Sequence, residues 1–171
     1  MNPHGPGYEW QDRLPIIGAR CVTPGEGRLI AGVRIRRLPA LPDERGVLTE
    51  ILRRDDPEFT GFGQVYLTTT YPGAVKAWHY HQQQTDMICC VWGELKLALY
   101  DDREGSDTRG VVNEAFLGAS NRLLVKVPNG IHHGWKCVGD RAALIVNIPD
   151  RPYEYGAPDE HRMDPHENDI P

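Results

Sequence analysis

The chain has 171 residues, of which 24 are acidic and 19 basic, so its formal net charge is −5. Acidic and basic residues are interspersed and no run of Lys and Arg occurs in the sequence, so we expect no nucleic-acid partner. No apolar run approaches the roughly 20 residues of a membrane span, and residues 1–15 lack the features of a signal peptide. We therefore expect a cytoplasmic, single-domain protein with one apolar core and no membrane association.

Residues 1–28 are rich in Gly and Pro and show no sustained period, which predicts a poorly ordered N-terminal arm before a domain at 29–171. The four cysteines form no CxxC pair, so we interpret them as reduced thiols that act as small apolar side chains. Cys89 and Cys90 are adjacent in a strand-like run, so at most one of them can face the interior of a barrel.

Short β-rich runs occupy, in chain order, residues 29–38, 47–52, 65–71, 87–102, 122–128 and 142–149. Gly93 divides the run at 87–102, and the last run is nearly continuous and apolar, as expected of a strand buried on both faces. Turn clusters separate the runs, and no segment of ten or more residues has a helical period. The pattern predicts an all-β antiparallel sandwich or barrel, over which the polar, Pro-rich residues after Pro149 fold as a C-terminal segment.

The histidines are grouped. His79 and His81 form an HxH pair whose side chains would leave a strand on the same face, whereas His132 would alternate away from His133 to the outer face. The offsets among eight positions match the two-part sequence signature of cupins, with an Asp where a Glu is usual: Gly73, His79, His81, Asp86, Gly93, Pro128, Gly130 and His133. We therefore predict a cupin-type antiparallel double-stranded β-helix, or jelly-roll barrel, with a histidine-lined pocket.

From about Ile30 to the C-terminus the chain also resembles the dTDP-4-dehydrorhamnose 3,5-epimerase family. The matching motifs are Asp43-Glu44-Arg45-Gly46 with Glu50, Gln64, Gly73, Lys76-Ala77-Trp78-His79-Tyr80, Gly93-Glu94, Pro128-Asn129-Gly130, His133-Gly134-Trp135, Glu160-His161 and Asp164-Pro165. The resemblance implies epimerisation of a nucleotide-linked 4-keto-6-deoxy sugar of the dTDP-4-dehydro-6-deoxyglucose type, in deoxysugar or polysaccharide biosynthesis. It also implies a homodimer that needs no cofactor.

The same resemblance implies roles for individual residues. His79 would be the general base that removes a proton next to the ketone, Asp164 would orient it, and Tyr155 would return a proton on the opposite face. The residues that would line the substrate site are Arg45, which suits a diphosphate, Glu50, Gln64, Lys76, His81 and His133.

Two positions depart from the family. His81 stands where the family has Gln, and Asp86 replaces a Lys that helps to bear the enolate charge. Both changes move the site toward a metal-binding set of His79, His81, Asp86 and His133, which suits a divalent metal but would exclude His79 as a free base. Two alternatives therefore stay open: a metal-dependent cupin enzyme, either an oxygenase or an isomerase, and a non-catalytic cupin that binds nucleotide sugars.

Overall fold

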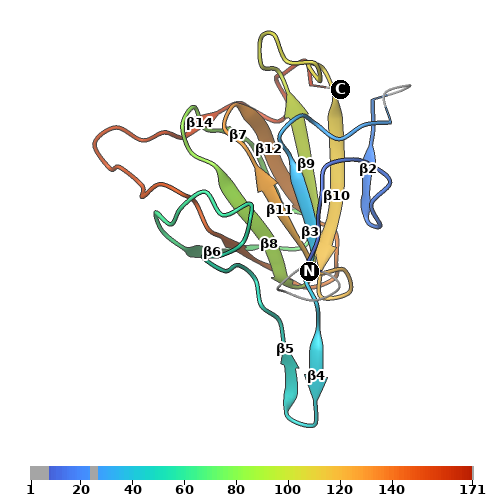
Figure 1. Ribbon diagram of the computed structural model, residues 1–171. Helices are drawn as coiled ribbons and strands as arrows, with labels where there is room; N and C mark the ends of the chain where they lie inside the picture. Colours follow the sequence, from blue (N-terminus) through green and yellow to red (C-terminus); the bar gives the residue numbers. More distant parts are fainter. Residues whose placement is uncertain (1–7, 24–26, 171) are drawn as a thin grey trace.

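The structure, a computed structural model, describes residues 8–23 and 27–170 and contains no helix within these residues. Two six-stranded antiparallel sheets face each other (Figure 1). The first has, in spatial order, β1 (Trp10–Gln11), β3 (Arg34–Arg37), β11 (Leu123–Val127), β8 (Asp86–Trp92), β13 (Ala143–Asn147) and β6 (Tyr66–Thr70). The second has β14 (His161–Arg162), β7 (Val75–Tyr80), β12 (Ile131–Cys137), β9 (Glu94–Asp101), β10 (Val112–Gly118) and β2 (Ala19–Cys21). The all-β, jelly-roll prediction is confirmed.

The apolar core fills the space between the two sheets and is built from alternate residues of their strands. Cys90 belongs to this core, whereas Cys89 packs in a second cluster with Leu38 and Leu124 on the other face of the first sheet. The two thiols therefore lie on opposite faces, as predicted, and all four cysteines are free.

Some strand predictions needed correction. β10 was not predicted, because Asn113 and Glu114 interrupt its apolar pattern; both are buried, and Glu114 forms ion pairs with Arg20 and Lys96. The expectation that the run at 142–149 is buried on both faces was wrong, since burial in β13 alternates between full and partial.

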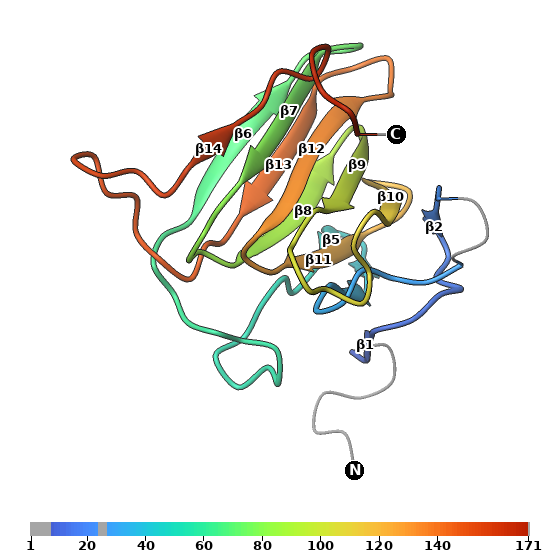
Figure 2. The ribbon, with the colours of Figure 1, turned by 90° about the horizontal axis from the view of Figure 1, so that it is seen from above.

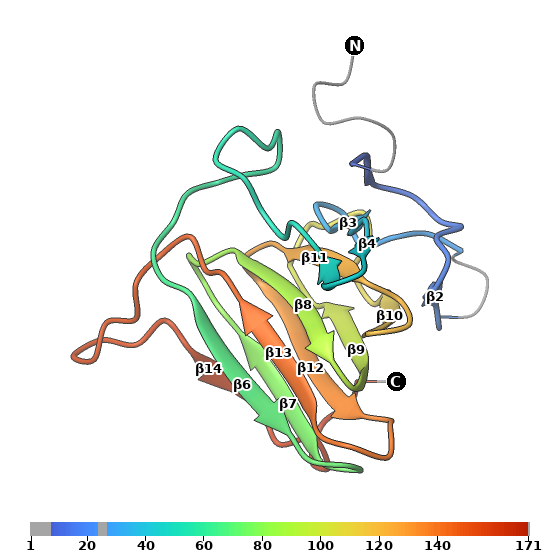
Figure 3. The same cartoon turned by 90° about the horizontal axis from the view of Figure 1, so that it is seen from below.

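The two ends of the chain extend the sheets. In the N-terminal segment, β1 pairs with β3 and β2 pairs with β10, while residues 1–7 and 24–26 of the expected arm lie outside the described residues. At the other end β14 pairs with β7, so the C-terminal segment returns to the barrel. Before that strand, an exposed loop after β13 projects away from the sheets (Figures 2 and 3).

A third element stands apart from the barrel. Strands β4 (Leu41–Asp43) and β5 (Gly46–Leu48) form a two-stranded hairpin that extends away from both sheets (Figure 1). All of its strand residues are exposed, including the side chains of Leu41, Val47 and Leu48. Within the described part of the chain, no helix is long and apolar enough to cross a membrane.

Candidate active site

A pocket of about 1020 Å³ is lined by residues of both sheets. Its walls come from β6, β7 and β12, and the loop that precedes β14 forms the remaining side. The volume of the pocket is at the upper limit of the range of about 300–1000 Å³ that is usual for ligand sites, and its lining combines aromatic with titratable side chains. The arrangement can therefore hold a polar small molecule.

Strand alternation explains the wall that β6 contributes. Gln64, Tyr66 and Thr68 are two residues apart, and all three line the pocket. The Tyr66 hydroxyl accepts a hydrogen bond from Asn147 Nδ2 at 2.9 Å, and Asn147 also lines the pocket. Burial raises the pKa of Tyr66, so this phenol stays protonated at neutral pH.

A β-bulge decides which residues of β7 reach the pocket. His133 on β12 pairs with His79, but the next inward residue, Trp135, pairs with Lys76, three positions away. Simple alternation would send Lys76 and His79 to opposite faces, because they are an odd number of residues apart. The extra residue re-aims the strand, and both side chains line the pocket.

His79 is half-buried in the wall of the pocket. Its ring makes edge contacts with His133 and Trp135, at centroid distances of 6.1 and 6.2 Å. Burial lowers the pKa of His79, and among nearby charges Glu160 opposes that shift most strongly. The neutral imidazole that a general base requires is therefore favoured by the site.

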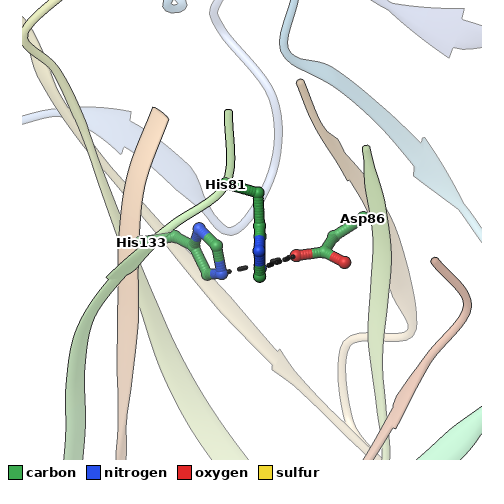
Figure 4. A group of neighbouring side chains, drawn as sticks. All are labelled: His81, Asp86 and His133. Carbon is green, nitrogen blue, oxygen red and sulfur yellow. Dashed lines mark ion pairs between the residues drawn. The ribbon is translucent and has the colours of Figure 1, made fainter. Parts of the chain in front are cut away.

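His81 and His133, with Asp86 behind them, form a tight group that joins the two sheets (Figure 4). His81 follows β7, His133 lies on β12, and Asp86 begins β8 in the opposite sheet. One donor atom from each residue lies within 4.8 Å of the others. Of the four residues predicted as a metal set, the structure thus brings together three, and His79 is not part of this group.

Buried charge dominates the electrostatics of this group. Burial alone would raise the pKa of Asp86, but the flanking imidazoles of His81 and His133 lower it. Burial disfavours a charged His81, yet the Asp86 carboxylate outweighs it and raises the pKa of His81. Complete burial lowers the pKa of His133 to about 4, so this ring is neutral near pH 7.

Asp159 fixes the C-terminal segment over the pocket. Its carboxylate accepts hydrogen bonds from the backbone N–H groups of Gln82, Gln83 and Gln84, at 2.8 to 2.9 Å. Its carbonyl oxygen accepts one from the His81 ring. Asp159 thereby ties the loop after β7 to the loop that carries Tyr155.

That loop presents an aromatic pair. Tyr155 lines the pocket although its residue is 91% exposed, and its ring meets Tyr153 edge-on at 5.1 Å. Arg162, on β14, also lines the pocket and donates a hydrogen bond to the Glu160 carboxylate at 3.0 Å. The candidate acid therefore lies on the open side of the pocket.

Six of the ten predicted site residues line the pocket directly: Gln64, Lys76, His79, His81, His133 and Tyr155. A seventh, Asp86, lies behind the lining in contact with His81 and His133. The structure does not bring the other three to it. Asp164 is exposed and accepts a hydrogen bond from the His166 backbone, while Arg45 at the hairpin tip and Glu50 form ion pairs outside the pocket.

The lining residues that were not predicted include Tyr66, Asn147, Glu160 and Arg162. The two-residue spacing from Gln64 could have identified Tyr66. Asn147 is the one polar residue in an otherwise apolar run, so it too left a signal. Glu160 and Arg162 sit in an irregular polar segment, where the sequence alone offers no pattern that points inward.

His132 lies outside the pocket lining. It projects from the opposite face of β12 to His133, and its ring packs against Tyr80 at 4.6 Å and Tyr100 at 6.0 Å. The residue is buried rather than solvent-exposed, because these rings cover that face of the sheet.

The facing sheets and the histidine-lined pocket define a cupin-type enzyme scaffold, and comparison with known proteins gives the family. The chain belongs to the dTDP-4-dehydrorhamnose 3,5-epimerase family, whose sequence profile matches residues 28–170. It is thus a member of a family of nucleotide-sugar epimerases, as predicted.

Individual relatives agree with this assignment. The chain is 38% identical over 141 residues to the probable low-salt glycan biosynthesis epimerase Agl13 of Haloferax volcanii, covering 78% of this chain and 87% of that one. It is 34% identical over 135 residues to the spore coat polysaccharide biosynthesis protein SpsL of Bacillus subtilis, covering 79% and 89%. A dTDP sugar isomerase structure from Desulfovibrio desulfuricans G20 superposes with a TM-score of 0.75 at 30% identity, covering 82% of this chain and 95% of that one.

Proposed function

We propose that this chain epimerises a nucleotide-linked 4-keto-6-deoxy sugar in glycan biosynthesis, with His79 as the general base. The observation that carries the proposal is the position of His79, a half-buried imidazole in the wall of the pocket of an epimerase-family barrel. In the reaction His79 takes a proton from the carbon next to the ketone. The electron pair of that C–H bond forms the C=C bond of an enolate, whose negative charge lies on the former ketone oxygen. Tyr155 then gives its proton to the other face of that carbon, which inverts it, and solvent restores both groups.

Cationic side chains of the pocket suit the nucleotide part of such a substrate. Lys76, Arg151 and Arg162 line the pocket, and the Lys76 ammonium is held by Thr68 Oγ1 and the Thr69 carbonyl at 2.8 and 2.7 Å. An ammonium fixed in this way can pair with a phosphate as a point charge. We propose that these residues bind the diphosphate, and that the proton transfers themselves need no cofactor.

The direct test is hydrogen exchange at carbon. Incubation of dTDP-4-dehydro-6-deoxyglucose with the protein in heavy water should place deuterium next to the ketone, as read by mass spectrometry. His79→Gln should lower the exchange rate by about 10²-fold or more, because a positioned general base contributes on that scale. Binding without exchange by the unchanged protein would instead favour the non-catalytic alternative.

A second test concerns the carboxylate that supports His79. The family resemblance assigns this role to Asp164, whereas the charge of Glu160 acts most strongly on His79 in the structure. Glu160→Gln and Asp164→Asn should therefore be compared at equal substrate concentrations. We expect the larger loss of kcat from Glu160→Gln; the reverse order would mean that the tail rearranges so that Asp164 turns inward when substrate binds.

We further propose that the protein works as a cytoplasmic homodimer. Four free cysteines, three of them buried, suit a reducing compartment. An isolated two-stranded hairpin is marginal in water, yet the β4–β5 hairpin exposes Leu41, Val47 and Leu48. A partner subunit would cover these apolar side chains and would bring Arg45 toward a pocket that it does not reach in its own chain.

The oligomer is tested by light scattering coupled to size-exclusion chromatography. The unchanged chain should have twice the mass of one protomer. Leu48→Glu should shift that mass toward the monomer, because it would bury a charge in the contact. Glu44→Gln in the turn of the hairpin is the matched control and should leave the mass unchanged. A monomeric unchanged protein would refute the dimer.

A further inference from the structure

Asp86 is a buried carboxylate with one oxygen occupied and one left free. Only 1% of its side chain is exposed, and Oδ1 accepts hydrogen bonds from Gln84 Nε2 at 2.8 Å and Asn147 Nδ2 at 3.0 Å. Oδ2 is also buried; among the described residues it faces the Nε2 atoms of His81 and His133 as ion-pair contacts, without a hydrogen bond of standard geometry. A buried anion of this kind is costly unless a positive partner meets it. The two amides fix the carboxylate so that Oδ2 faces His81 and His133.

The hydrogen bonds of the two imidazoles determine which nitrogen is free. His81 Nδ1 contacts the Asp159 carbonyl, and His133 Nδ1 contacts the Ile131 carbonyl at 3.1 Å. A carbonyl oxygen only accepts, so each Nδ1 must carry the hydrogen. In a neutral ring Nε2 then holds a lone pair, and the Gln84 amide accordingly donates toward His81 Nε2 at 3.3 Å. Both Nε2 atoms point at the free oxygen of Asp86.

The spacing of these three acceptors fits a metal ion. His81 Nε2 and His133 Nε2 lie 3.2 and 3.5 Å from Asp86 Oδ2. Zinc bonds of about 2.0–2.2 Å at tetrahedral angles separate neighbouring donors by about 3.3–3.6 Å, so two edges of the tetrahedron already match. The imidazole donors lie within 4.8 Å of each other, so an approach of at most about 1.5 Å would match the third edge.

We propose that His81, Asp86 and His133 form a site for a divalent transition metal of the zinc type, with His79 outside it. Two imidazoles and one carboxylate are a donor set that such ions prefer, and three protein ligands leave coordination positions open. The His81 and His133 rings line the pocket, so the open positions face the space where a ligand would bind. The backbone and amide contacts described above orient all three ligands from behind, as in established metal centres.

The site also relates to the departures from the epimerase family. His81 and Asp86 replace a Gln and a Lys of the family pattern, so the two changes together create two of the three ligands, and one of them removes the lysine charge. If the proposed function holds, a cation here would face the substrate ketone and stabilise its enolate in place of that lysine. Metal binding itself does not depend on this role.

The experiment measures binding of the metal alone to the full-length protein after treatment with a chelator and dialysis. Calorimetry should show about one equivalent of Zn²⁺ bound, and Co²⁺ should give visible d–d absorption bands of a site with nitrogen and oxygen ligands. His81→Gln restores the family residue and should weaken Zn²⁺ binding by at least about tenfold, as should Asp86→Asn. The exposed His166 offers a matched control, and His166→Gln should leave binding unchanged.

Each result bears on the proposal. Saturable binding that both site variants lose and the control keeps would support it. Absence of stoichiometric Zn²⁺ binding by the unchanged protein would overturn it and would leave a proton shared by the same three residues. Equal binding by all variants would also overturn it. If Asp86→Asn does not fold, Zn²⁺ binding by His81→Gln, a change at a partly exposed residue, provides the test. Deuterium exchange with His79→Gln tests the epimerase function separately.

Discussion

Gly93, in the turn between β8 and β9, should be unusually intolerant of substitution. Its φ is +72°, a left-handed conformation that costs a residue with a Cβ about 1–2 kcal/mol. A Cβ placed there would also lie 2.7 Å from the Ala142 carbonyl oxygen and 2.8 Å from Ala143 Cα. Both neighbours are backbone atoms of the adjacent strand region, so neither can rotate away.

The two effects can be summed for Gly93→Ala. Overpacking against a fixed neighbour typically costs about 1–3 kcal/mol in addition to the backbone strain, which gives a loss of about 2–5 kcal/mol. For a chain of this size each kcal/mol lowers Tm by about 2–4 °C, so we expect a fall of roughly 4–20 °C.

Gly105 supplies the matched control. Its φ of +75° is nearly the same, but a Cβ there would meet nothing within 4 Å. Gly105→Ala should therefore lose only the strain of about 1–2 kcal/mol. The assay is urea unfolding of both variants beside the unchanged chain. Equal losses of unfolding free energy would refute the steric reasoning, since only the backbone neighbours distinguish the two sites.

Three further predictions concern charged groups. Hydrogen bonds outweigh burial and lower the pKa of the fully buried Asp101 to about 2. About 2 kcal/mol of unfolding free energy, present above pH 4, should therefore be lost as the pH falls toward 2. Asp101→Asn should reduce this dependence of the unfolding free energy on pH, as measured by acid unfolding. Asp56→Ala removes the carboxylate that pairs with the buried Arg36 at 3.0 Å, and it should lower the free energy of unfolding in urea by about 3–5 kcal/mol. Asp55→Ala, which removes an exposed ion pair, should lower it by less than about 1 kcal/mol. Lys76→Met should raise the Kd for dTDP about tenfold and weaken its salt dependence in calorimetric titrations; an unchanged Kd would remove Lys76 from the nucleotide site.

Much of the fold follows from short-range pattern. The alternation of apolar side chains identified most core strands, and Gly93 marked the division between β8 and β9. β10 was not predicted because a Glu is normally exposed, whereas Glu114 is buried in ion pairs with Arg20 and Lys96. Ion pairs between residues far apart in sequence leave no local period, so no reading of single segments could have found this strand.

The candidate site divides in the same way. His79 and His133 could be predicted because the fixed offsets of the cupin signature place them on strands, and Gln64 because it matches a family motif. The hairpin residue Arg45 was predicted from its motif, yet the chain fold carries it away from its own pocket. Glu160 could not be predicted, because its position depends on the return of the tail that Asp159 ties to the loop after β7.

The sequence by itself determined the barrel and its central histidine, since strand period, turn residues and fixed offsets act over a few residues each. Only the tertiary structure decided which groups share the pocket. The bulge opposite His133 turns Lys76 inward together with His79, and the facing of two sheets brings Asp86 to His81. Both depend on how one strand registers against another, and register is fixed by contacts across the whole fold rather than by any one segment.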